Sequence, residues 1–167
     1  MVLTASELIA SLQNEVRILL HLGKIDPAML DYRPSPKQRS TIELLRYLSI
    51  MGPTLVQYVL ADTPDPALWP AAAKAAEAQD FEQTLAAIAT HTDTYAALLA
   101  GVSDDAFRAE VTGGHGAKTA RGAVIVNFVL CGCAAYRTQL FLYLKACGRE
   151  ELSTMNLWAG VDAPAAV

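Results

Sequence analysis

Three histidines are the side chains in this sequence with the clearest capacity to bind a metal, and their spacing argues against it. His21, His91 and His115 lie far apart, and no pair has the i, i+4 spacing that places two imidazoles on one helix face. We therefore expect no three-histidine metal site. His21 is expected near the end of the first helix, where a cation complements the helix dipole. The other two are interpreted as surface or boundary residues.

The three cysteines fall within one predicted helix: Cys131, Cys133 and Cys147. At about 100° per residue, the first two point about 200° apart, so they can neither form a disulfide nor chelate one ion together. Reduced thiols, as in a cytosolic protein, are the expectation. A cysteine–histidine nucleophilic pair stays open, because such partners meet only in the fold.

A glycine-rich stretch, residues 113–119, resembles a phosphate-binding loop at first sight. That motif needs a glycine directly before the lysine and another five positions earlier, where this chain has Ala117 and Thr112. It also needs a buried strand in front, which residues 105–111 do not provide. We interpret the stretch as a flexible connection between helices.

Composition places the chain in one domain, residues 1–167, large enough to bury a hydrophobic core. Hydrophobic residues make up 53%, and the net charge is -4, with no run of Lys or Arg that would follow a phosphate backbone. We expect no nucleic-acid partner. The apolar run 122–136 ends at Arg137 and falls short of the roughly 20 residues of a spanning helix, so no membrane partner is expected. With no basic leader at the start, the protein is expected to be cytoplasmic.

The sequence predicts an all-α antiparallel four-helix bundle, with a long connection between helices two and three. The expected helices cover about 4–22, 40–61, 80–101 and 119–147, each with apolar residues at helical spacing. Within the long connection, the alanine-rich residues 71–78 are expected to form a short helix. No strand is predicted, and the tail 149–167 contains Trp158 as a residue that packs on the bundle. Capping boxes mark the first three helix starts, at Thr4 and Glu7, Ser40 and Glu43, and Asp80 and Gln83.

Two stretches resemble the DinB-like (DinB/YfiT-type) superfamily of helical-bundle metalloenzymes. Residues 30–36 are a Pro-containing loop leading into the helix at 40–48, like the entry to the second helix of that family. Residues 136–140, Tyr-Arg-Thr-Gln-Leu, with a closing glycine at 148, resemble its last helix. The resemblance covers essentially the whole chain in the order and length of its helices.

At the three positions where that family carries metal-binding histidines, this sequence has Tyr47, Gly132 and Tyr136. Glycine offers no side chain, and neutral phenols are poor ligands for divalent ions. The resemblance therefore implies a divergent member that has lost the metal site, with no cofactor. Arg137 points about 100° away from Tyr136 and is expected to pair with an acidic residue or a dimer partner.

The same alignment brings Tyr47, Gly132 and Tyr136 to one place in the bundle, flanked by Gln139 and Cys133. The two phenols could bond each other, Gln139 or water, or they could orient a small apolar or aromatic molecule in a pocket. We expect such a ligand-binding bundle or a non-catalytic homodimer. The alternative is the family's thiol-dependent transferase or isomerase chemistry with a divalent metal. Whether the protein is an enzyme stays open, and metal-dependent catalysis is not expected.

Overall fold

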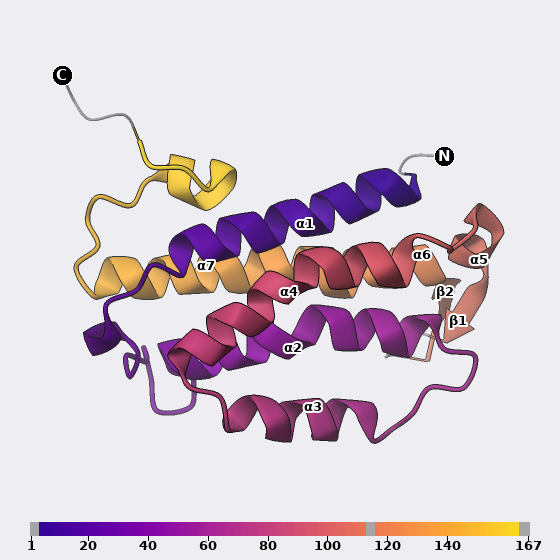
Figure 1. Cartoon of the computed structure of the whole chain (residues 1–167), viewed down its shortest axis with the longest axis horizontal. Helices are drawn as coiled ribbons and strands as arrows, with labels where there is room; N and C mark the ends of the chain where they lie inside the picture. The colour runs from indigo at the N-terminus through magenta and orange to yellow at the C-terminus, as the bar shows by residue number, and fades with distance from the viewer. Residues whose placement is uncertain (1–3, 113–115, 164–167) are drawn as a thin grey trace.

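The computed structural model describes residues 4–112 and 116–163, and it consists mainly of four long helical segments. Three of them are α1 (Ala5–Leu22), α2 (Thr41–Leu60) and α4 (Phe81–Leu99). The fourth runs without a break from Arg121 to Ala146 through α6 (Arg121–Val124), a π-helical segment η2 (Ile125–Leu130) and α7 (Cys131–Ala146). Figure 1 shows the four segments side by side along one long axis. The predicted all-α bundle is confirmed.

Side-chain caps begin three of these helices where the sequence places them. In α1, α2 and α4 the N-cap side chain accepts a hydrogen bond from the third helical residue, whose own side chain accepts one in return from the N-cap N–H. These reciprocal bonds satisfy donors that the helix itself leaves unpaired. The caps are Thr4, Ser40 and Asp80, and all three observed helices begin at the next residue.

The helices are not antiparallel throughout, because the long connection returns the chain along the bundle. It contains α3 (Leu68–Glu77), which packs on α2, so that α4 starts beside the start of α2. Arg46, early in α2, accordingly donates a hydrogen bond from Nε to the Gln79 carbonyl at 2.9 Å. Helices α2 and α4 therefore run in the same direction, as Figure 1 shows by the colour gradient, and both are antiparallel to α1 and to the last helical segment.

Between α4 and the last helix, the chain forms more structure than a loop. The short helix α5 (Asp104–Arg108) precedes an antiparallel pair of strands, β1 (Glu110–Thr112) and β2 (Lys118–Ala120). The expected absence of strands was therefore wrong: Thr119 pairs with Val111. The last helix, expected to begin at about residue 119, begins at Arg121. Strands of three residues are too short to show an alternating pattern in the sequence.

The last helical segment is more exposed than its two apolar stripes suggested. Leu140 and Tyr143 are buried, but Phe128 is 46% exposed and Leu142 59%. By length and composition, Arg121–Ala146 could cross a bilayer, so the argument that the run is too short was wrong. Core helices pass the same test, and the absence of a membrane partner stays a prediction. The expected homodimer also stays a prediction.

The C-terminal segment lies on α1 and is held there by polar contacts. Arg17 Nη1 donates to the Gly160 carbonyl at 3.2 Å, and His21 Nε2 lies 3.1 Å from Asn156 Nδ2 and 3.2 Å from the Asp162 carboxylate. His21 sits in the last turn of α1, as expected. Trp158, in the π-turn η3 (Met155–Ala159), is 71% exposed, so its predicted packing on the bundle was wrong.

Helices α2 and α4 approach each other closely in the core at Gly52. A Cβ built on Gly52 would lie 1.8 Å from the hydroxyl oxygen of Tyr95, which is 1% exposed. No side chain larger than hydrogen fits there unless the tyrosine moves. Around this contact, the core is made of buried aliphatic residues from all four helical segments, including Leu12, Leu44, Leu45, Met51, Ile88, Leu99, Ile125, Val129, Leu140 and Leu144.

We predict that Gly52→Ala destabilises the protein by about 1–3 kcal/mol, the usual cost of forcing extra atoms into a packed core. Gly101→Ala is the matched control, because a Cβ there meets nothing within 4 Å. Urea unfolding followed by circular dichroism measures both. A Gly52→Ala variant as stable as the wild type would show that α2 and α4 can separate without cost.

Candidate functional site

Tyr47 of α2 and Tyr136 of α7 lie in contact, at the place where the sequence located a site. Their ring centroids are 4.9 Å apart, and the rings are inclined by 64° in an edge-to-face arrangement. Such pairs add to the stability given by burial alone. The two phenols thus form one cluster between antiparallel helices, one partner from each.

Gly132, one turn before Tyr136, faces Met51, one turn after Tyr47. A Cβ added at position 132 would lie 3.3 Å from the terminal methyl of Met51. Methionine is flexible enough to fill irregular spaces of this kind. The sequence suggested an empty space beside Gly132, because glycine has no side chain. In the structure, the Met51 side chain occupies that space.

The two flanking residues face other partners. Gln139 Nε2 donates a short hydrogen bond to the Tyr143 hydroxyl, which itself donates to the Arg39 carbonyl at 3.1 Å. Tyr143 thus connects α7 to the residues before α2, and Gln139 supports the Tyr143 hydroxyl from within α7. Burial raises the pKa of the Cys133 thiol to about 12, with a smaller contribution from the Glu15 carboxylate. Cys133 is accordingly held as a neutral thiol, a poor nucleophile.

A cavity of about 430 Å³ opens on the other side of Tyr47, between α2 and α3. Trp69 of α3 also lines it and contacts Tyr47 edge to face, with the ring centroids 5.8 Å apart at an angle of 61°. The Arg39 guanidinium lies 4.1 Å from the centroid of the Tyr47 ring, a cation–π contact. Neither Arg39 nor Trp69 was predicted from the sequence, because Arg39 precedes α2 and Trp69 lies in the first turn of α3, ahead of the alanine-rich residues that predicted a helix there. The complete lining is Arg39, Glu43, Arg46, Tyr47, Ile50, Trp69, Ala73, Ala76 and Glu77.

The phenol of Tyr47 is held in its neutral form. Burial raises its pKa from the ordinary 10 to about 12, and the neighbouring Tyr136 adds to that increase. The Arg39 cation acts in the opposite direction with a smaller effect. At neutral pH, Tyr47 can donate or accept a hydrogen bond, but it does not act as a phenolate base.

At the positions where the resemblance implies metal ligands, this chain has the phenols Tyr47 and Tyr136 and Gly132, with no imidazole, thiolate or carboxylate among them. Met51 occupies the space at Gly132, and the raised pKa of Tyr47 opposes the phenolate that would bind a cation. Across residues 4–112 and 116–163, no group of three or more His, Cys, Asp or Glu side chains could hold a metal ion.

His91 was expected at the surface or at the boundary of the core, but it is buried, with 5% of its surface exposed. Its Nε2 lies 2.8 Å from the Ser49 carbonyl. His115 lies outside the described residues.

Comparisons with known proteins agree with this architecture. A family model described as the DinB superfamily matches residues 12–129, which includes Tyr47 and ends before Gly132. The crystal structure of a DinB-like protein from Bacillus subtilis aligns with a TM-score of 0.65 and 14% sequence identity, covering 87% of this chain and 95% of that one. At that identity the structural match shows the fold alone. No curated protein matches the sequence.

The pKa of Tyr47 gives a prediction for stability at alkaline pH. The folded state holds the phenolic proton of Tyr47 more tightly than the unfolded chain does. The contribution of Tyr47 to the free energy of unfolding is therefore complete below pH 10 and is lost as the pH rises toward 12. Tyr47→Phe removes the titrating group, so its melting temperature should fall less steeply over that range. Thermal melting at a series of pH values measures the difference. Tyr58→Phe, at a phenol that is 45% exposed, is the control, and equal pH slopes for all three proteins would contradict the assignment.

Proposed function

The chain belongs to the DinB superfamily, and from that premise we propose that it binds a small planar aromatic molecule in the cavity between α2 and α3, without using a metal. The observation that supports this proposal is the edge-to-face contact of Tyr47 and Trp69 in the wall of a cavity of about 430 Å³. A cavity with aromatic and aliphatic walls and few polar groups is the usual form of a small-molecule site. Its volume suits a ligand of one or two rings.

The charged residues of this cavity are mostly engaged by the protein itself. Arg46 bonds the Gln79 carbonyl, and the Glu43 carboxylate accepts a hydrogen bond from the Ser40 N–H at 2.8 Å. Arg39 lies against the Tyr47 ring. The surface that remains for a ligand is therefore made by the two aromatic rings together with Ile50, Ala73, Ala76 and Glu77. Such walls favour a flat apolar ring over a strongly charged molecule.

The family's thiol-dependent transferase or isomerase chemistry has no comparable support in this chain. That chemistry needs a divalent ion and an activated thiol or water. The ligand positions do not fit an ion, and the pKa of Cys133, the cysteine beside the site, is raised to about 12. The geometry around Tyr47 favours binding over this alternative.

Binding can be followed through Trp69, because the only other tryptophan, Trp158, can be removed without touching the cavity. We predict that titrating Trp158→Phe protein with para-cresol changes the Trp69 emission and saturates. Tyr47→Ala in the same background should weaken binding by about tenfold, in line with aromatic contacts worth roughly 0.5–1.5 kcal/mol beyond the area they bury.

The matched control is Trp69→Phe, which leaves only the exposed Trp158 as reporter and should show no saturable change. A response from Trp158 as large as that from Trp69 would indicate a nonspecific effect of the phenol. A Trp69 signal that does not saturate would contradict a site between α2 and α3.

Metal content tests the other half of the proposal. We predict that protein purified without chelators contains well below one equivalent of zinc, nickel or iron, because Tyr47, Gly132 and Tyr136 supply no suitable set of ligands. Elemental analysis of the purified protein measures this directly. One bound metal per chain that survives dialysis would refute the metal-free proposal.

A further inference from the structure

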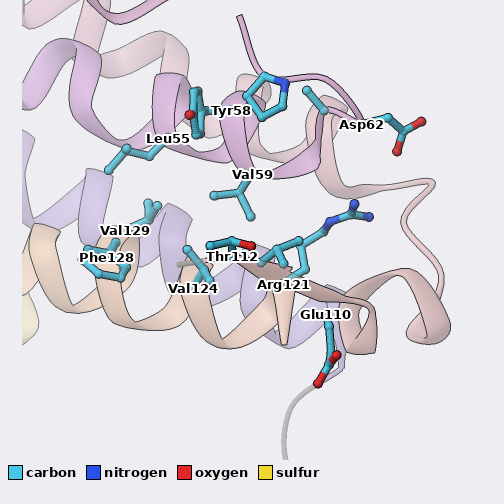
Figure 2. Close-up of a pocket in the computed structure, with 13 residues that line it drawn as sticks. Leu55, Tyr58, Val59, Asp62, Glu110, Thr112, Arg121, Val124, Phe128 and Val129 are labelled. Atoms are coloured by element: carbon cyan, nitrogen blue, oxygen red, sulfur yellow. The ribbon is translucent and has the colours of Figure 1, made fainter. Parts of the chain in front are cut away.

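A second and larger cavity, of about 770 Å³, lies at the N-terminal end of the last helical segment, near Arg121. It shares no lining residue with the cavity beside Tyr47. The end of α2 and the chain just beyond it form one side, and strand β1, α6 and the π-helical segment η2 form the other. Figure 2 shows side chains from these elements facing one another across the cavity.

The inner walls of this cavity are apolar. Val59 of α2 faces Val124, and Leu55 lies deeper on the same helix, opposite Val129. Two large side chains at the edge are unusually exposed for their size: Tyr58 at 45% and Phe128 at 46%. Apolar surface gathered around a cavity, rather than scattered singly, marks a place where an apolar partner is bound.

Arg121 brings a positive charge to these walls. Its Nη1 reaches the Ala106 carbonyl at 3.5 Å, a long contact, and its Nε is buried without a hydrogen-bond partner. Among the described residues, its guanidinium forms no ion pair with a carboxylate. A guanidinium without a carboxylate partner in the lining of an apolar cavity favours a ligand that supplies an acceptor.

The two acidic residues of the cavity leave this charge uncompensated. The Glu110 carboxylate lies 3.8 Å from Lys118 Nζ, and Figure 2 shows it directed away from Arg121. Asp62 is exposed at the opening, where solvent screens its charge. The cation that borders the apolar walls is thus the Arg121 guanidinium, whose planar fork matches a carboxylate.

The wall carrying Val129 and Phe128 has an uncommon backbone geometry. Residues Ile125–Leu130 form a π-helix inside an otherwise α-helical segment. Wider turns of this kind are rare and occur frequently at functional sites. The π-helical geometry does not depend on the charge of Arg121, and it also indicates this cavity as a functional site.

We propose that this cavity binds an aliphatic monocarboxylate, with the carboxylate on Arg121 and the hydrocarbon chain between Val59 and the π-helical wall. The site is separate from the one in the proposed function and does not depend on it. The ligand class follows from the lining among the described residues, where the Arg121 cation without a carboxylate partner borders an extended apolar surface. A purely apolar ligand would leave the guanidinium without an anion, and an amphipathic amine would place its charge against the guanidinium.

Isothermal titration calorimetry with decanoate, decanol and decylamine tests the three possibilities below their micelle concentrations. Decanoate should bind with a stoichiometry of one and more tightly than the other two. Arg121→Gln should weaken decanoate by about tenfold or more, the scale of a lost charge-assisted hydrogen bond, and leave decanol unchanged. Arg121→Lys should recover part of the affinity, because the charge stays but the planar fork is lost.

Two matched controls separate the site from general effects. Arg108→Gln removes a nearby arginine that is 62% exposed and should leave decanoate binding unchanged. Val59→Phe fills the cavity and should weaken both decanoate and decanol, whereas Leu142→Phe, on an exposed face outside it, should weaken neither.

The proposal is overturned if wild-type protein does not bind decanoate, if decylamine binds more tightly, or if Arg121→Gln binds decanoate as well as the wild type. Tyr47→Ala should leave decanoate binding intact. Loss of decanoate binding in that variant would show that the ligand occupies the cavity beside Tyr47, and would equally overturn the assignment to Arg121.

Discussion

The buried ion pair between Glu15 and Arg137 is the interaction on which the arrangement of the bundle depends. Arg137 Nε lies 2.9 Å from one Glu15 oxygen, and Nη2 donates to the other at 3.2 Å. Both side chains are largely shielded from water, with 6% of the arginine and 12% of the glutamate exposed. Separating such a pair would leave a charge in a poorly solvated place, at a cost of several kcal/mol. The pair therefore fixes the register between α1 and α7.

The same arginine also organises the chain beyond the bundle. Its Nη1 donates a short hydrogen bond to the carbonyl of Leu157, so one guanidinium joins the first helix, the last helix and the C-terminal segment. Burial raises the pKa of Glu15 and the Arg137 charge lowers it, with burial the larger effect. The glutamate thus depends on its partner to stay ionised. Because α7 is fixed in this way, Tyr136, one residue earlier, is held against Tyr47.

The features that could be predicted best from the sequence are those that depend on residues close together in the chain. Capping boxes and apolar spacing identified the starts of α1, α2 and α4, because a cap is decided within four residues. The pairing of Arg137 with an acid was confirmed, and the Arg-x-Gln-Leu stretch now has structural roles: an ion pair, a bond to Tyr143 and a buried Leu140. What the sequence could not predict depends on distant residues. Met51 fills the space at Gly132, and Trp69 reaches Tyr47 from a connection that shows no pattern.

The parallel course of α2 and α4 has a consequence for how the chain can change in length. Most surface connections tolerate insertion and deletion because they only join neighbouring ends. Here the connection must return along α2, whose 20 residues span about 30 Å at 1.5 Å per residue. If α3 were shortened, α4 could follow α2 only as an antiparallel hairpin, and Tyr95 would no longer meet Gly52. The alanine-rich segment is thus a spacer with a minimum length, and selection on that length would be independent of any ligand that α3 helps to bind.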